Sequence, residues 1–393
     1  MLKTPVYIYI LFFASLLSSS AQIPEPDWNK QSGIRGCDFY TDILEDANKG
    51  YTVCGAVKIK GNSFDFELIR FTENGDTLWT KTIGTEKKEI PKRLTQLTDK
   101  SYVLMGSCTE GETQSCLLLK LDENGNEIWK KELSAEYTSV EDIISLSDNH
   151  FALAGSKSET PNDPKIWMAT LDENGEFIME KLFMTDMTGC ARSIKEIPNG
   201  DFALAAQISE AGKNNCDIIA IRISPLGQAK WFSWIKTPDQ KVWPACICCS
   251  PDSALMIVGW NGKCLNDINS ADPIFDYDLV LNKINSSGEI LWTKSVDREG
   301  SEGGNALTIR PDGTFIIAGI KATSFIGKIG PWLLNIDPDG NELNEKLLRL
   351  RFNNDHASRI INSSDGGFVV IGPGMQEEEN TRSDGWIVKF RAL

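Results

Sequence analysis

The amino-acid sequence predicts an all-β protein, a seven-bladed β-propeller of four-stranded antiparallel blades. Three observations carry this prediction. A repeat of about fifty residues occurs seven times, each repeat contains four strand-like runs, and the last repeat lacks a fourth strand that the N-terminal segment can supply. A fixed period of this length is typical of architectures in which each unit packs against its neighbours.

The N-terminus predicts export. Lys3 precedes an apolar run at 6–17, and Ser19, Ser20 and Ala21 are the small residues of a cleavage site. These are features of a signal peptide, and the apolar run is too short to cross a membrane as a helix. We therefore expect residues 1–21 to be a signal peptide and residues 22–393 to be a single propeller domain, secreted or periplasmic and without a membrane span.

Two landmarks recur along the chain. The first is a turn followed by an apolar strand that ends in glycine or alanine, at 49–55, 100–106, 149–155, 200–206, 252–259, 312–319 and 365–372. The second is a pair of strands around an Asn-Gly, Asp-Gly or Ser-Gly turn, as at 68–79, 117–129 and 279–292. Glycine supplies the positive φ that tight hairpin turns require. Four short antiparallel strands per repeat describe the blades of a propeller.

The two ends of the chain predict how the ring closes. The last repeat stops after its third strand, at 384–390, and Trp28 precedes Trp79 by about one repeat length. We expect residues near 26–32 to form the N-terminal strand that completes the last blade. This pairing would remove an exposed sheet edge.

A tryptophan recurs at one position of the outer strand, as Trp28, Trp79, Trp129, Trp231 and Trp292. Such a set suggests either a surface for stacking ligands or packing between adjacent blades. Met179 and Asn344 occupy the position in the other two blades, and packing tolerates this change more readily than a shared ligand site does. We expect these side chains to pack between blades.

The repeat pattern resembles that of secreted bacterial β-propeller repeat proteins, with the best local matches at 365–372, 386–390 and 122–130. The resemblance covers essentially the whole mature chain. It implies a propeller fold and export, and it brings no catalytic residues, because that family has no uniform activity. Weaker likenesses to quinone-cofactor propellers and to sialidase Asp-boxes fail at the spacing of their motifs, so we expect no cofactor.

Composition narrows the choice of partners. The formal net charge is −15 at pH 7, and Lys and Arg do not gather in a stripe, so we expect no nucleic-acid partner. The chain has only two histidines, His150 and His356, which argues against a zinc site. We expect a monomer that binds a glycan or an extracellular or envelope protein.

The innermost strands predict a polar ring near the mouth of the central channel. Counted by repeat, one position of this strand is occupied by Asp42, Arg93, Asp142, Ser193, Cys246, Asn305 and Arg359. Convergent polar groups in a concave place are the usual sign of a binding site. The alternative is that the ring is only the polar lining of a wet channel, and the sequence leaves both interpretations open.

The connections within each blade predict which face binds. The turns inside the first and the second hairpin of each blade are short. The connections from the second to the third strand and from one blade to the next vary in length, as at 156–164, 261–276, 322–330 and 373–383. Variable loops gathered on one face favour binding there.

The loop 261–276 and the residue that follows it contain the weak calcium candidates Asp267, Asp272, Asp276 and Asp278, although the EF-hand spacing is missing. We therefore expect no metal site. Cys108 and Cys116 fall on neighbouring antiparallel strands, so their spacing predicts a disulfide. Cys190 with Cys216 and Cys246 with Cys264 are weaker disulfide candidates, with Cys248 as a rival partner for Cys264.

The sequence thus favours a non-catalytic binding or scaffold propeller that recognises its ligand through the loop-rich face. The alternative is a polysaccharide-active enzyme, a lyase or a glycosidase, on the same scaffold. A glycosidase needs two carboxylates that flank the scissile bond, whereas a lyase needs a base. His356, with Arg359 nearby, is the weak catalytic candidate, and Tyr40 and Tyr137 are the tyrosines near this face.

Overall fold

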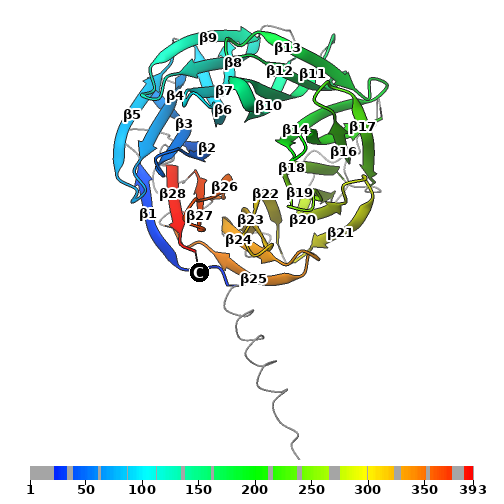
Figure 1. The fold of residues 1–393 in the computed structure, drawn as a ribbon. Coiled ribbons are helices and arrows are strands. Elements are labelled where there is room, and N and C mark those ends of the chain that lie inside the picture. Colours follow the sequence, from blue (N-terminus) through cyan, green and yellow to red (C-terminus); the bar gives the residue numbers. More distant parts are fainter. Residues whose placement is uncertain are drawn as a thin grey trace, which may run out of the picture.

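The computed structural model describes residues 22–32, 39–60, 63–85, 87–111, 113–133, 138–160, 163–210, 216–236, 241–264, 275–298, 300–322, 329–350, 355–373 and 385–392. The predicted signal peptide lies outside these residues. Within them the chain forms seven four-stranded antiparallel sheets, which are arranged as blades around a central opening (Figure 1). The predicted seven-bladed propeller is confirmed. In the described part of the chain, no helix has the length and apolar character that a membrane crossing requires.

The first four blades follow the chain without crossovers. Blade 1 contains β2 (Phe39–Glu45), β3 (Tyr51–Lys60), β4 (Ser63–Phe71) and β5 (Thr77–Ile83). Blade 2 contains β6 (Lys88–Gln96), β7 (Tyr102–Glu110), β8 (Thr113–Leu121) and β9 (Glu127–Leu133). Blade 3 contains β10 (Ser139–Ser145), β11 (Phe151–Lys157), β12 (Lys165–Leu171) and β13 (Phe177–Phe183). Blade 4 contains β14 (Thr188–Glu196), β15 (Phe202–Ser209), β16 (Asp217–Ile223) and β17 (Ala229–Ile235).

The last blade takes its outer strand from the other end of the chain. Blade 5 contains β18 (Lys241–Cys249), β19 (Leu255–Cys264), β20 (Phe275–Ile284) and β21 (Ile290–Val296). Blade 6 contains β22 (Glu302–Ile309), β23 (Phe315–Ala322), β24 (Ile329–Ile336) and β25 (Glu342–Leu347). Blade 7 contains β26 (Arg359–Asn362), β27 (Phe368–Gly372) and β28 (Gly385–Phe390), and β1 (Pro26–Ser32) completes it.

Turn chemistry sets the hairpins. In blade 2, the Asp122 carboxylate accepts hydrogen bonds from the backbone N–H groups of Asn124 and Asn126, at 2.9 and 2.8 Å. Gly125 lies between them with φ of 76°, a conformation that side chains with a Cβ rarely adopt. The carboxylate thus supplies hydrogen-bond acceptors for backbone N–H groups that a tight turn leaves without a backbone partner.

The recurring tryptophans pack between blades, as predicted. Trp28 donates a hydrogen bond from Nε1 to the Glu73 carbonyl of the next blade, at 3.1 Å. Its ring lies so close to Gly75 that a Cβ there would be 2.9 Å from the ring. Trp129 repeats the hydrogen bond to Glu173, at 3.0 Å. Each of these side chains therefore seals an interface and is unavailable as a stacking platform.

The N-terminal closure is also confirmed. β1 pairs antiparallel with β28, with Trp28 opposite Lys389 and Lys30 opposite Ile387, and Figure 1 shows these two strands side by side. Ile23 is buried in the cluster between blades 6 and 7, and its backbone N–H donates to Asn344 Oδ1 at 2.9 Å. The segment 22–32 thus contacts blades 6, 7 and 1.

The predicted Cys108–Cys116 disulfide is wrong. Both cysteines are free, and the register pairs Cys108 with Ser115 and Cys116 with Ser107. Residues directly opposite share a face, and the next residue points to the other face. Cys108 accordingly packs in the cluster between blades 1 and 2, and Cys116 in the cluster between blades 2 and 3. Their thiols lie on opposite sides of one sheet.

The weaker disulfide candidates are not bonded either, among the cysteines that the structure describes. Cys190 is free, and Cys216 Sγ accepts a hydrogen bond from Gln207 instead of bonding to Cys190. The side chain of Cys264 lies outside the description. Cys246 and Cys249 have C-x-x-C spacing, but they pack in different inter-blade clusters. They are therefore not arranged as a metal-binding pair.

Thiol chemistry tests this correction. In protein unfolded under non-reducing conditions, we expect an alkylating reagent to modify both Cys108 and Cys116, since neither is consumed in a disulfide. Peptide mapping by mass spectrometry checks this result. Recovery of a linked 108–116 peptide from the same unreduced sample would restore the original prediction.

Candidate site at the channel mouth

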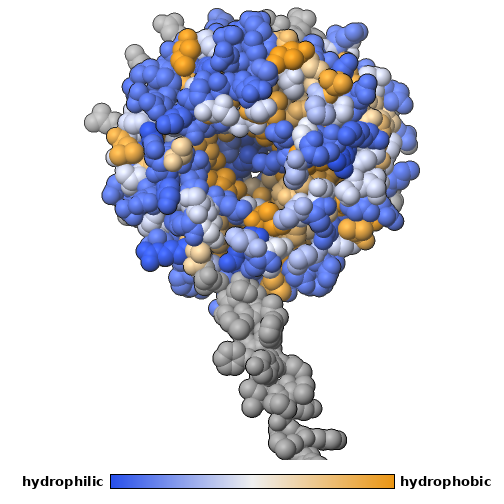
Figure 2. Space-filling model, viewed as in Figure 1, coloured by the Kyte–Doolittle hydropathy of each residue, from blue (hydrophilic) through white to orange (hydrophobic). Residues whose placement is uncertain are grey.

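A cavity of about 500 Å³ opens where the seven inner strands converge, and Figure 2 shows the molecule hollowed at its centre. One residue from the inner edge of every blade lines it. These residues are Thr41, Lys92, Glu141, Arg192, Ala245, Asn305 and Ser358. The remaining lining comes from Ile90, Pro91, Arg93, Trp243, Pro244, Trp260 and His356. We call this cavity the channel mouth.

A repeated β-bulge places these side chains. In blade 1, Tyr40 pairs with Gly55 and Asp42 pairs with Cys54, so Thr41 has no partner on β3. The same shift in register leaves Lys92, Glu141, Arg192, Ala245 and Asn305 unpaired in blades 2 to 6. Ser358 takes the equivalent place just before β26 in blade 7. A bulge adds one residue and re-aims its side chain. We call these seven the bulge residues.

The predicted polar ring lies one residue further along each strand. Asp42 and Asp142 hold this position, and both are buried. Asn305 was assigned to the ring wrongly, because the register puts Ala306 opposite Ala318 as Asp42 is opposite Cys54. Asn305 is instead a bulge residue of the mouth.

Members of the ring bind one another. Arg359 Nε lies 2.7 Å from Asp42 Oδ1, and Arg359 Nη2 lies 3.9 Å from Asp142 Oδ1. Arg93 Nε lies 3.4 Å from Asp142, and Ser193 Oγ donates to Asp142 Oδ2 at 2.9 Å. The ring is therefore a largely buried network of ion pairs across blades 7, 1, 2 and 3, and the Ser193 hydroxyl extends it to blade 4.

This network also fastens the backbone of neighbouring blades. Asp42 Oδ2 accepts the N–H of Leu94 at 3.0 Å, and Asp142 Oδ2 accepts the N–H of Ile194 at 2.9 Å. Burial by itself would lower the pKa of Arg359, but the charges of Asp42 and Asp142 outweigh it and raise that pKa. With these bonds made, the ring residues serve the fold, which supports the lining interpretation over the binding one.

The bulge residues of blades 2 to 4 form a charged wall of the mouth. Glu141 lies between Lys92 and Arg192, with closest N–O distances of 3.0 and 3.5 Å. Burial alone would raise the pKa of Glu141, but Lys92, Ser139 and Arg192 together lower it, so the group is ionised at neutral pH. The Arg192 side chain is 36% exposed and keeps donors free to meet a ligand.

An aromatic wall faces the mouth from blade 5. Trp243 and Trp260 line the cavity, and Tyr277 contacts both rings, with centroids 6.1 and 5.9 Å away. Trp260 Nε1 donates to Asn305 Oδ1 at 3.1 Å, which fixes its ring plane. The ring lies against Gly303, where a Cβ would be 2.4 Å from ring atoms. Glycine is therefore required to seat the tryptophan.

The weak catalytic candidates separate in the structure. His356 lines the mouth and is half-buried, and burial lowers its pKa, so its imidazole is neutral at neutral pH. Arg359 lies in the ring, and its charge is balanced by two carboxylates. Tyr40 is buried, whereas Tyr137 lies outside the described residues.

A second hollow, of about 610 Å³, lies at the edge of blade 3 between β11, β12 and β13. Four of its charged side chains are already paired, Lys157 with Glu180 at 2.7 Å and Lys165 with Asp163 at 2.5 Å. The mouth is the stronger candidate because seven blades converge on it.

Comparison with known proteins supports the fold and leaves the ligand open. No family model matches the chain, and no curated protein matches it in sequence. The polysaccharide lyase Uly1 is similar in structure, with TM-score 0.63 and 8% identity over 94% of this chain and 100% of that one. The WD40 domain of Neurospora crassa Pan2 has a TM-score of 0.57 and 12% sequence identity, and the match covers 95% of this chain and 98% of that one.

A third solved structure, YCF48 bound to a D1 peptide, gives a TM-score of 0.51 and 14% identity over the whole of both chains. At such low identities the likeness shows the propeller fold alone, because one fold hosts many functions. Binding proteins and enzymes both occur among these neighbours. The expected relationship to secreted bacterial repeat proteins stays a prediction.

Proposed function

We propose that this protein is an exported binding module that recognises an acidic glycan at the channel mouth. One observation carries the proposal. The lining combines three cationic side chains, Lys92, Arg93 and Arg192, and one carboxylate, Glu141, with the rings of Trp243 and Trp260. Arg93 is balanced by Asp142 in the ring, and Glu141 offsets one of the other two cations, so the mouth keeps one net positive charge in a chain whose formal charge is −15.

Each wall suits one part of such a ligand. A guanidinium binds a carboxylate through two parallel N–H donors, and Arg192 is exposed enough to do so. An indole ring offers a rigid apolar face on which the C–H face of a sugar ring can lie. A concave site with an apolar wall and few oriented polar groups is the usual form of a small-ligand site.

The alternative is a polysaccharide lyase, and the neutral imidazole of His356 in the lining is the observation that favours it. A glycosidase is less suited, because a hydrolytic site needs two carboxylates on either side of the bond. Among the described residues that line the mouth, Glu141 is the one carboxylate, and it is paired with Lys92 and Arg192.

Calorimetric titration with uronic-acid oligosaccharides tests the binding proposal. We expect Arg192→Ala to weaken binding about 10- to 100-fold, since a hydrogen-bonded charge contributes about 1.5–3 kcal/mol. Trp260→Ala should weaken it similarly by removing the sugar platform. Arg391→Ala is the matched control, because Arg391 pairs with Asp27 on blade 7, away from the mouth.

Unchanged affinity in Arg192→Ala and Trp260→Ala would contradict the proposal. Product analysis after incubation with the same oligosaccharides separates the alternative. Unsaturated products that disappear in His356→Ala would identify a lyase, while binding without any product supports the module.

A further inference from the structure

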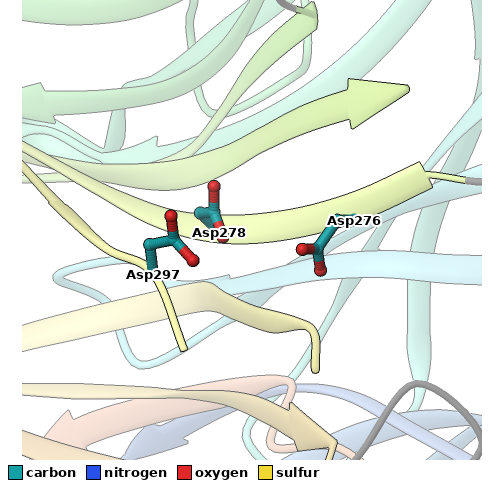
Figure 3. Close-up of side chains that lie close together, drawn as sticks. All are labelled: Asp276, Asp278 and Asp297. Carbon is teal, nitrogen blue, oxygen red and sulfur yellow. The ribbon is translucent and has the colours of Figure 1, made fainter. Parts of the chain in front are cut away.

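Three aspartates meet at the end of blade 5. Asp276 and Asp278 lie on β20, and Asp297 follows β21. Each offers a carboxylate oxygen, and these oxygens lie within 4.8 Å of one another. Figure 3 shows the three side chains gathered in one place. Of the other weak calcium candidates, Asp267 and Asp272 lie outside the described residues.

Strand geometry forces the carboxylates together. Asp276 and Asp278 are two residues apart on one strand and therefore share a face. Leu279 pairs with Val296, so continuing the register by one residue sets Asp278 opposite Asp297. Like charges directly opposite on neighbouring strands are destabilising. The described part of the chain places no lysine or arginine within ion-pair distance of these three carboxylates.

A second observation shows that the cluster is incomplete. Asp278 is 7% exposed, and its buried Oδ1 has no hydrogen-bond partner. Asn261, opposite Asp278 on β19, is 5% exposed, and its Oδ1 also lacks a partner. Buried polar atoms are normally bonded, and an exception calls for an explanation such as an ion.

Electrostatics points the same way. Burial, followed by the charges of Asp297 and Asp276, raises the pKa of Asp278 to about 6, although Lys263 partly opposes this. The pKa of Asp276 is raised as well, through burial and Asp297. Burial and the neighbouring carboxylates thus disfavour the charged form of these groups, and a bound cation would offset both effects.

We propose that Asp276, Asp278 and Asp297, with the amide oxygen of Asn261, form a binding site for Ca²⁺. The donors are all oxygens, which hard cations prefer. Two oxygens on opposite sides of a Ca²⁺ ion lie about 4.8 Å apart, since each bond is about 2.4 Å, and the cluster falls within that span. Mg²⁺ has bonds near 2.1 Å and demands a closer octahedron.

The site has a structural consequence for the mouth. Tyr277 lies between Asp276 and Asp278, and its ring contacts Trp243 and Trp260. An ion bound by the two aspartates would therefore hold the strand that carries the centre of the aromatic wall. The calcium proposal itself does not depend on the identity of the glycan.

Melting curves of chelator-treated protein test the site. We expect CaCl₂ at a hundredfold excess over the dissociation constant to raise the Tm by about 3 °C. Asp278→Asn should melt higher than the wild type in chelator, because it removes a crowded charge, and should lose the response to calcium. These opposite signs distinguish a ligand from a residue needed only for the fold.

Asp297→Asn, at an exposed position, is a second variant expected to lose the response. Asp186→Asn, at an exposed turn between blades 3 and 4, is the matched control and should respond like the wild type. A wild type that shows neither a shift nor heat of binding with CaCl₂ would overturn the proposal. So would a full response in both Asp278→Asn and Asp297→Asn, or an equal response to MgCl₂ at the same concentration.

Discussion

Replacing Arg359 with methionine is expected to lower the free energy of unfolding by about 3–5 kcal/mol at pH 7, the cost of leaving buried charges without their partner. The Arg359 side chain is 15% exposed, and Asp42 and Asp142 are almost fully buried. Without the guanidinium Asp42 loses the cation it pairs with among the described residues, whereas Asp142 keeps Arg93 as a partner. Chemical denaturation with urea measures the loss.

The loss of stability in the Arg359→Met variant should depend on pH in a defined direction. In the variant Asp42 is buried without its cation, while Asp142 keeps Arg93, so burial disfavours the charged form of Asp42 in the folded state and protonation relieves that cost. Stability of the variant should then increase as pH falls from 7 toward 5, and the gap to the wild type should narrow. Arg391→Ala, an exposed ion pair, is the control and should change little. A constant gap over this range would mean that packing, not charge, explains the loss.

Removing residues 22–32 should cost at least about 5 kcal/mol, because burial of one large apolar side chain contributes about 2 kcal/mol and each hydrogen bond about 1 kcal/mol. The deletion removes β1 and with it Trp28, the partner of Gly75, and Ile23 from the core. It also leaves β28 as an open edge, so we expect aggregation.

A chain that begins at Gln22 is the reference for this deletion, and Trp28→Phe is an intermediate case that keeps the strand. Differential scanning calorimetry and light scattering check both effects. If the shortened chain melts like the reference and stays monomeric, the closure contributes nothing to stability.

The architecture was predictable because its signals are local. The repeat length can be read directly from the sequence, because turn residues such as Gly125 and the tryptophans Trp79 and Trp129 recur at regular spacing. Their role between blades also followed, since Met179 and Asn344 hold the same place. Even the pairing of β1 with β28 could be inferred by matching Trp28 to Trp79.

The site was harder to predict, for reasons of register. A bulge adds one residue that a count of positions does not reveal, so the sequence pointed to Asp42 and Arg359 instead of Thr41 and Ser358. The Cys108–Cys116 disulfide was predicted wrongly for a similar reason, because the spacing of two cysteines in the sequence does not show on which face of the sheet each thiol lies. Asp297 was missed because it lies 19 residues from Asp278 in the sequence, and only the pairing of β20 with β21 brings the two together.

The repeated bulge separates specificity from stability. Each blade offers the mouth one side chain from an unpaired position, while the residues on either side of it carry the pairing and the ion network. Seven positions scattered along the sequence can therefore change with little effect on the core. A library varied at these positions alone would amount to a seven-letter recognition code on a constant ring, and descendants of one ancestor could acquire different ligands without refolding.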